Sequence, residues 1–318
     1  MLQVLRELRE EAKLGLRPAI LYTLRKSLDY VCIAYCKILF PFVARTWAGG
    51  TLRTTVNGVE MCVEKGERGI HEELILFGKR ERFSTDFLAK TIQTDDVIVD
   101  VGANIGYYAL LEGRIAAEGQ VFAIEPVAES LRALKNNVDF NQLTNISVHG
   151  IALGDHDGMA TMFVCDHCNW SSPNNAHPDR VIDKQDVEME SLDSFIEKVV
   201  GKVPSLIRMD VEGYEAAVMR GATKYQNQSG RSRFFIEIHP LLLEPLEIRE
   251  IVSGLKDNGY KVEAIFREYN PGYRRWFGPA YGLIDRLDIG TGFGYLGNTY
   301  DELEKAIALG TTHAFFTK

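Results

Sequence analysis

Short apolar runs alternate with helical patterns from residue 97 onward, and this rhythm limits the fold more than any other feature of the sequence. Strands are predicted at residues 97–101, 120–126, 146–153, 205–211 and 233–240, and most consecutive pairs are separated by a segment of helical period. Such segments connect parallel strands and cover both faces of their sheet. The sequence therefore predicts an α/β fold with a mostly parallel, twisted sheet between helices.

The beginning of the chain differs in charge from the rest. Residues 1–50 carry eight Lys and Arg against four Asp and Glu, whereas the whole chain has a net charge of −8. We expect a basic helical segment that either caps the rest of the protein or makes peripheral contact with a membrane through residues 1–45. The apolar stretch at residues 28–43 is too short and too interrupted to predict a membrane-spanning helix.

The remainder, residues 51–318, is predicted to form one catalytic domain with three distinctive segments. Apolar and polar residues alternate around an Asn-Gly pair at residues 51–64, which indicates a β-hairpin. Residues 154–202 interrupt the rhythm of strands and helices and are predicted to be a hairpin and loop insertion. Residues 266–300 are rich in aromatic residues, Gly and Arg, and form either a lid or a structured loop.

The acidic balance and the cysteine content narrow the class of protein. A net charge of −8 argues against a protein that binds nucleic acid by neutralising phosphates. Five cysteines are too few for a disulfide scaffold, so a reducing, cytoplasmic location is expected, with membrane association left open by the basic segment. Cys165, His167 and Cys168 could form a zinc site with His177, although a loop with free thiols is preferred.

The first chemically informative strand end is Asp100-Val-Gly102-Ala103-Asn104-Ile-Gly106. In an open α/β sheet, ligands bind beyond the carboxyl ends of the strands. This turn lacks the G-x-G-x-x-G spacing that seats a pyrophosphate at a helix N-terminus. Its leading carboxylate would repel a pyrophosphate, but it suits the ammonium and sulfonium charges of S-adenosylmethionine.

Glu125 ends the second predicted strand and is the second informative position. A single carboxylate there can accept hydrogen bonds from both hydroxyls of a ribose, which S-adenosylmethionine and NAD have in common. Glu125 therefore indicates a nucleoside without choosing between these cofactors. The alternative is that Glu125 caps the helix predicted to begin near Val127.

Two later strand ends carry a third group of polar residues, Asp210, Glu212, Glu237 and His239. The period of two places Glu237 and His239 on one face of their strand. A carboxylate in an apolar strand needs a partner or a bound cation, so we expect the four side chains to converge. Asp210, Glu212 and Glu237 could hold Mg²⁺, which is not favoured. Glu215 is interpreted as a favourable charge at a helix N-terminus.

In this order and spacing, DVIVDVGANIGYYAL, VFAIEP, SLDSF, MDVEGYEAAVMRGA and FFIEIHP resemble the FkbM-type methyltransferases over roughly residues 70–240. The resemblance implies a Rossmann-like class I methyltransferase fold, S-adenosylmethionine as cofactor and methylation of oxygen. It also implies which residues form the site. Glu125 would bind the ribose, and Asp210 and Glu212 would lie on the reaction side, where Asp210 would also contact the cofactor. The methionine end of the cofactor would lie along Asp100, Gly102, Ala103, Asn104 and Gly106. Glu81 stands where the family often has a glutamate, and Arg208-Met209-Asp210 replaces its usual Lys-Ile-Asp.

The sequence thus predicts methyl transfer to an oxygen, typically a hydroxyl, of a small-molecule, sugar or glycan acceptor. The enzyme must align the reacting groups and remove the acceptor proton, for which His239 is the first candidate base and Asp210 the second. If residues 266–300 form a lid, Arg274 and Arg275 would bind an anionic group. The alternatives are an NAD-dependent Rossmann oxidoreductase and a non-catalytic nucleoside-binding module.

Overall fold

The computed structural model describes residues 50–64, 70, 71, 74, 80–228, 230–268 and 294–318, together with scattered positions between residues 8 and 27. Most of the predicted basic segment and most of the aromatic segment, including Arg274 and Arg275, lie outside the described residues. Within the described part of the chain, no helix combines the length and the apolar character that crossing a membrane requires.

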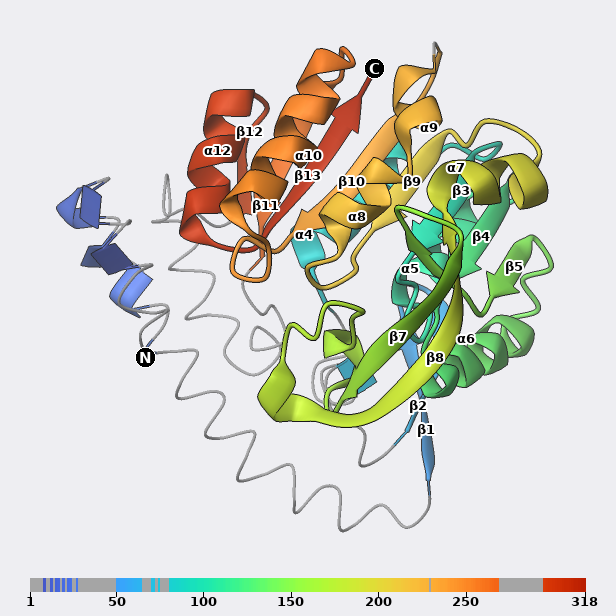
Figure 1. Cartoon of the computed structure of the whole chain (residues 1–318). Helices are drawn as coiled ribbons and strands as arrows, with labels where there is room; N and C mark the ends of the chain where they lie inside the picture. Colours follow the sequence, from blue (N-terminus) through green and yellow to red (C-terminus); the bar gives the residue numbers. More distant parts are fainter. Residues whose placement is uncertain are drawn as a thin grey trace.

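The central sheet has eight strands in the order β12-β11-β13-β10-β9-β3-β4-β5 (Figure 1). Its strands are β3 (Val97–Val101), β4 (Gln120–Ile124), β5 (Ile146–His149), β9 (Leu206–Met209), β10 (Arg233–Ile238), β11 (Lys261–Arg267), β12 (Gly294–Gly297) and β13 (Thr312–Thr317). Neighbours from β10 to β5 pair in parallel, whereas β13 is antiparallel to β10 and β11, and β12 is antiparallel to β11. The predicted mostly parallel α/β sheet is confirmed, and its strand order reverses between β3 and β9, the place where such sheets bind ligands.

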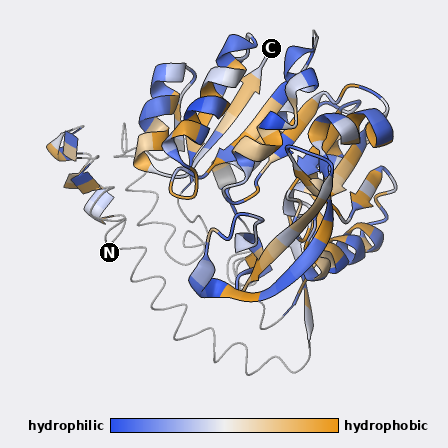
Figure 2. Ribbon diagram, viewed as in Figure 1, coloured by the Kyte–Doolittle hydropathy of each residue, from blue (hydrophilic) through white to orange (hydrophobic). Residues whose placement is uncertain are grey.

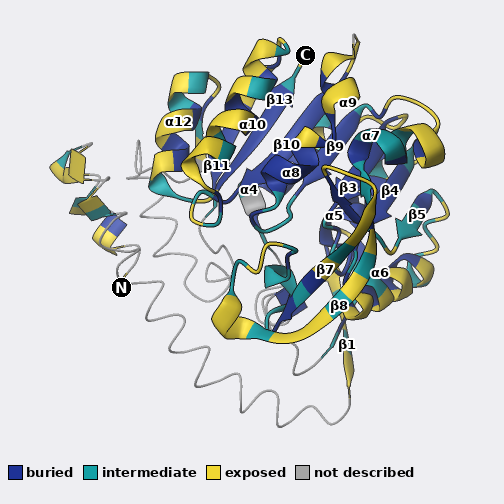
Figure 3. Ribbon diagram, in the orientation of Figure 1, coloured by how far each residue is buried: buried dark blue, intermediate teal, exposed yellow. Residues whose placement is uncertain are grey.

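Helices cover both faces of this sheet because its inner strands are apolar on both sides. All residues of β3 and β9 are buried, as expected for strands between two helical layers. One face packs against α4 (Arg82–Thr91), α5 (Tyr107–Ile115) and α6 (Ala128–Phe140), and the other against α7 (Leu192–Phe195), α8 (Glu215–Arg220), α9 (Thr223–Asn227), α10 (Pro245–Asp257) and α12 (Tyr300–Leu309). Figure 2 shows the apolar strands, and Figure 3 shows them buried beneath helices with exposed outer sides.

The predicted hairpin at residues 51–64 is confirmed. β1 (Thr51–Val56) and β2 (Val59–Glu64) pair in antiparallel register across Asn57 and Gly58, which both have positive φ. Two such residues form the tight turn whose twist matches the flanking strands. The hairpin packs on the face of the sheet that carries α6, where Cys62 N donates a hydrogen bond of 2.7 Å to Asn137 Oδ1.

The insertion is a second sheet of three strands. β6 (Ala152–Gly154), β7 (Gly158–Cys165) and β8 (Val181–Ser191) pair in the order β6-β8-β7, and β7 and β8 form a long curved ribbon (Figure 1). The predicted single strand at 146–153 is wrong, because the chain leaves the central sheet after β5 and β6 then joins the second sheet. The sequence does not predict β8, since this strand is largely polar and exposed and is ordered by its pairing with β7.

Candidate active site

Three strand ends meet at the carboxyl edge of the central sheet, after β3, β4 and β9. Gly102 N and Ala103 N both donate hydrogen bonds to Ile124 O, at 3.0 and 2.9 Å. Gly102 has φ +81, and a Cβ at this position would lie 1.9 Å from Asp210 O. Only glycine permits this approach, so the turn after β3 lies directly against the turn after β9.

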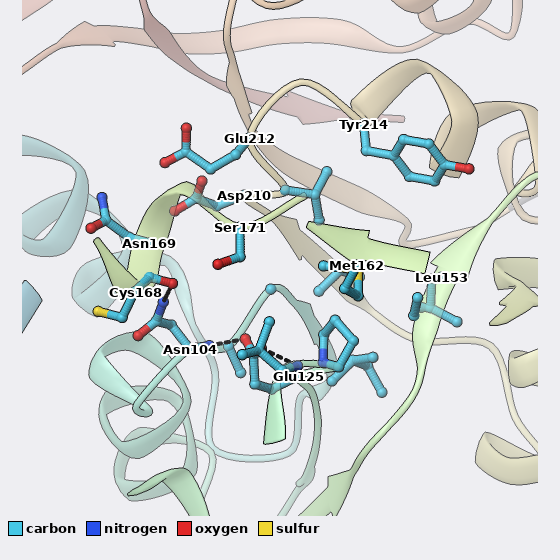
Figure 4. Close-up of a pocket in the computed structure, with 18 of the residues that line it drawn as sticks. Asn104, Glu125, Leu153, Met162, Cys168, Asn169, Ser171, Asp210, Glu212 and Tyr214 are labelled. Carbon is cyan, nitrogen blue, oxygen red and sulfur yellow. Dashed lines mark hydrogen bonds between the residues drawn. The ribbon is translucent and has the colours of Figure 1, made fainter. Parts of the chain in front are cut away.

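A cavity of roughly 800 Å³, counting its open mouth, lies over this junction. Asp210 and Glu212 lie together near one side, whereas Leu153 and Met162 of the insertion lie at another (Figure 4). Val127 and Tyr214 extend the apolar lining. A concave site that is largely apolar, with a few polar groups, is typical of the binding of a small organic molecule or cofactor.

Glu125 lines this cavity and is bound to the backbone through both carboxylate oxygens. Asn104 N donates to Oε2 at 2.9 Å, and Val127 N donates to Oε1 at 2.8 Å (Figure 4). The bond from Val127 is the helix contact that the alternative interpretation of Glu125 expected. Each oxygen can still accept from a ligand hydroxyl. Burial raises the pKa of Glu125 to about 7, so hydroxyl donors would stabilise its charged form.

Asp100 does not lie where the sequence analysis expects it. Its carboxylate is fully buried, and Asp100 is not among the residues that line the cavity. Arg208 Nη1 donates to Asp100 Oδ1 at 3.1 Å, and Arg208 Nη2 donates to Asp210 Oδ2 at 2.9 Å. Arg208 therefore supplies the positive charge that Asp100 requires. Asp210 lines the cavity instead, and its Oδ1 has no hydrogen-bond partner among the described residues.

The residues of the turn after β3 divide between the cavity and the following helix. Gly102, Ala103 and Asn104 line the cavity. Gly106 does not, because it begins α5 with φ +96 and packs against α6. Asn104 Nδ2 donates to Cys168 O at 3.1 Å, which joins the turn to the insertion.

His239 lies at the centre of an acidic cluster after β10, so the predicted convergence is found. Its Nε2 lies 4.0 Å from Asp210 Oδ1, 3.6 Å from Glu212 Oε2 and 3.5 Å from Glu237 Oε1. On the other side of the ring, Nδ1 shares a hydrogen bond of 2.7 Å with Oε1 of the fully buried Glu215. Glu215 thus orients the imidazole, a role that the helix-terminus interpretation missed.

The charges around His239 disfavour it as a base. Burial by itself would lower the pKa of His239, but Glu212, Glu215 and Glu237 raise it well above its usual value. A protonated imidazole has no lone pair with which to accept another proton. Burial raises the pKa of Glu212 to about 8 and that of Asp210 to about 7, which brings both carboxylates into the range useful for a general base.

A second cavity adjoins the first at Glu212, which lines both. We name it the acceptor-side cavity; its polar lining is Glu81, His177, Glu212, Glu237, His239, Glu268, Thr311 and His313. Three residues that line one or both cavities, Glu81, Asn104 and Glu212, have φ between 42° and 50°. Left-handed backbone of this kind costs roughly 1–3 kcal/mol outside glycine and tends to occur at functional sites.

His313 and Glu268 belong to the acceptor-side cavity but are not indicated by the sequence. β13 pairs with β10 so that His313 lies opposite Glu237, and His313 Nε2 is 3.2 Å from Glu237 Oε2 and 3.5 Å from Glu81 Oε2. Tyr108 OH donates to the same Glu81 oxygen at 2.7 Å. Only the position of β13 in the sheet brings these residues together, and no local motif signals it.

The cysteine and histidine residues of the insertion do not form the zinc site considered above. Cys165 is buried, Cys168 lines the first cavity, and the rings of His167 and His177 stack on Trp170 at centroid distances of 4.2 and 4.8 Å. Among the described residues, the side-chain groups close enough to share a metal ion contain no cysteine: Glu81 with Glu237 and His313, and Asp210 with Glu212 and His239. The loop with free thiols is therefore the better description.

Comparisons with known proteins found relatives in sequence and similar solved structures. The chain is 26% identical over 145 residues to Methyltransferase 1 of Beauveria bassiana, covering 40% of this chain and 58% of that protein. It is 25% identical over 230 residues to Hexuronic acid methyltransferase AglP of Haloferax volcanii, covering 72% of this chain and 86% of that protein. Among solved structures, TYW2 of M. jannaschii in complex with AdoMet is similar at a TM-score of 0.42 and 13% identity, covering 85% of this chain and 86% of that chain.

The model of the Methyltransferase FkbM domain matches residues 100–262, which is half of the chain. This range begins within β3 and ends within β11. It contains the turn after β3, Glu125, the acidic residues after β9 and His239. The match thus covers the strand ends that form the first cavity, and the protein belongs to the FkbM methyltransferase family.

Proposed function

We propose that the protein transfers a methyl group from S-adenosylmethionine to a hydroxyl oxygen of a sugar, a glycan or another small hydroxylated molecule. The observation that carries this proposal is that two cavities meet at Glu212. One contains a carboxylate suited to a ribose, and the other is lined by groups suited to an acceptor. The relative named as a hexuronic acid methyltransferase supports a sugar acceptor.

The residues of the first cavity fit S-adenosylmethionine. Glu125 would bind the ribose hydroxyls, and the apolar side chains of Val127, Leu153 and Met162 would surround the adenine. The unpartnered Oδ1 of Asp210 would offset positive charge at the methionine end. When bound, this cofactor supplies a methyl group that its sulfonium has activated toward nucleophiles.

Glu212 is the proposed base. Its carboxylate lines both cavities, so it can reach a hydroxyl that faces the first cavity from the second. His239, held by Glu215, lies 3.6 Å from Glu212 Oε2 and favours the charged form of that carboxylate. Glu215 and His239 are therefore positioning residues, and Asp210 is the second candidate base.

We expect kcat/KM to increase with pH between about 6 and 8. A carboxylate accepts a proton only in its charged form, and this form predominates above the pKa values of about 7 for Asp210 and about 8 for Glu212. Rates of methyl transfer at subsaturating acceptor, measured from pH 5.5 to 9.5, should rise and then level off above about pH 9, where Glu212 is almost fully charged. A rate that stays constant from pH 6 to 8 would exclude both carboxylates as the base.

Replacing Glu125 by Gln is expected to weaken binding of S-adenosylhomocysteine about 10-fold to 100-fold, because charged hydrogen bonds contribute about 1.5–3 kcal/mol. The amide nitrogen would also face one of the two backbone N–H donors that Glu125 now satisfies. Ligand-dependent thermal shifts measure the change. Glu129→Gln, at an exposed position of α6, is the matched control and should bind as the wild type does. Equal affinity for Glu125→Gln would remove Glu125 from the ribose site.

The proposed function is tested by incubating the purified full chain with S-adenosylmethionine and a panel of glycosides while measuring S-adenosylhomocysteine release. Acceptor-dependent release, with the methyl group found on an acceptor oxygen by mass spectrometry and NMR, is the expected result. An NAD-dependent oxidoreductase or a non-catalytic nucleoside-binding module would release none. Binding of NADH in place of S-adenosylhomocysteine would favour the oxidoreductase.

A further inference from the structure

Carboxylates dominate the acceptor-side cavity. Glu81, Glu212, Glu237 and Glu268 line it, and no Lys or Arg is among its described lining residues. Within this lining the positive groups are the imidazoles of His239 and His313, which lie 3.5 and 3.2 Å from Glu237. Arg80, outside the lining, pairs with Glu81. Among the described residues, a bound anion would therefore meet carboxylates and cationic groups whose charge is already paired.

We propose that this cavity selects an uncharged ring that carries several hydroxyls, such as a hexopyranoside, and rejects the matching hexuronoside. The proposal rests on the proposed methyltransferase function and specifies its acceptor. It also separates this chain from its relative named as a hexuronic acid methyltransferase.

Buried acceptor atoms in the cavity call for hydrogen-bond donors. Ser84 N donates to Glu268 Oε1 at 2.7 Å, while Glu268 Oε2 is buried and has no hydrogen-bond partner in the described part of the chain. Burial raises the pKa of Glu268 to about 7. In its charged form Glu268 can only accept, so a sugar hydroxyl satisfies Oε2, whereas a second carboxylate cannot.

An anionic acceptor would also impair the proposed base. Glu212 faces His239 and Glu237 from β10 and its following turn, Asp210 from the end of β9, and Arg80 from the chain before α4. One more negative charge beside Glu212 favours its protonated form. A protonated Glu212 does not accept a proton, so a uronate is disfavoured both in binding and in turnover.

Matched pairs of acceptors test the proposal. Methyl glycosides of glucose, galactose and mannose are each compared with the corresponding methyl glycoside of the uronic acid, which differs only at C6. At least one neutral member is expected to be methylated with a kcat/KM about 100-fold or more above that of its uronate partner, the factor that one unfavourable charge contact of about 3 kcal/mol produces. Glu268→Gln should reduce this ratio about tenfold, since its amide donates hydrogen bonds and carries no charge.

Glu263→Gln is the matched control, because Glu263 is an exposed residue of β11, the strand that precedes Glu268. For this variant, the ratio of kcat/KM for the neutral glycoside to kcat/KM for its uronate partner should equal that of the wild type. Uronates accepted as well as neutral sugars, or a ratio that Glu268→Gln leaves unchanged, would overturn the proposal. Binding of S-adenosylhomocysteine is measured on the same samples. Binding without transfer to any neutral sugar overturns this inference alone, whereas absence of binding overturns the proposed function itself.

Discussion

Replacing Glu212 by Gln is expected to lower kcat about 10³-fold, because positioned general bases typically contribute between about 10² and 10⁴ to the rate. The amide preserves the shape of the side chain but cannot accept the acceptor proton. Affinity for S-adenosylhomocysteine should stay within about threefold of the wild type, since the lost interaction belongs to the transition state. The rise of activity between pH 6 and 8 should also disappear.

Two further measurements make this result interpretable. Glu188→Gln, at an exposed position of β8, should leave kcat unchanged. Glu215→Gln should lower kcat less than Glu212→Gln does, because the cavity would still contain the base. It should also shift the pH profile, because the imidazole of His239 beside the base loses a charged partner. A Glu212→Gln enzyme with nearly normal kcat would assign proton removal to Asp210 or to solvent.

Replacing Arg208 by Met is expected to reduce the free energy of unfolding by about 3–5 kcal/mol, which is the usual effect of breaking a buried ion pair from one side. Arg208 is 4% exposed and Asp100 is 0% exposed, so the variant leaves a carboxylate in the core without its partner. The guanidinium also lies 4.2 Å from the ring centroid of Tyr108 and donates to Gly102 O at 3.2 Å. Urea denaturation of the wild type and the variant measures the loss.

The double variant Arg208→Met with Asp100→Asn distinguishes an unpaired charge from lost packing. It removes the uncompensated carboxylate of Asp100, leaves only Asp210 without this cation, and should recover part of the stability lost in the single variant. An Arg208→Met protein as stable as the wild type would mean that Asp100 is neutral in the folded state and that the ion pair does not stabilise it.

Local patterns were sufficient to predict several of the elements that border the first cavity. The apolar run of β3 and the helical period of α6 each specify one structure without help from distant residues. β8 is different, because its polar sequence becomes a strand only when β7 offers a partner. The separation of β5 from β6 likewise depends on the second sheet, which no local pattern indicates.

The residues of the candidate site divide in the same way, since some follow from local patterns and others depend on which strands are neighbours. Glu125 and Asp210 lie at the ends of predicted strands and Glu212 just beyond one, so the strand-end rule locates them. The partner of Asp100 depends on β3 and β9 being neighbours in register, which places Asp100 opposite Arg208. His313 depends on the antiparallel return of β13 beside β10. Predicting contacts of this kind requires knowledge of the strand order, and hydrophobic periodicity does not give that order.

Calorimetric titration of S-adenosylhomocysteine into the full chain tests the central claim most directly. We expect one site per chain with a dissociation constant in the micromolar range, about −7 to −8 kcal/mol. We also expect Glu125→Gln to bind S-adenosylhomocysteine more weakly and NADH to give no heat of binding. A folded protein that gives no binding heat at millimolar S-adenosylhomocysteine, or that binds NADH instead, would contradict the assignment of the first cavity to a methyl donor.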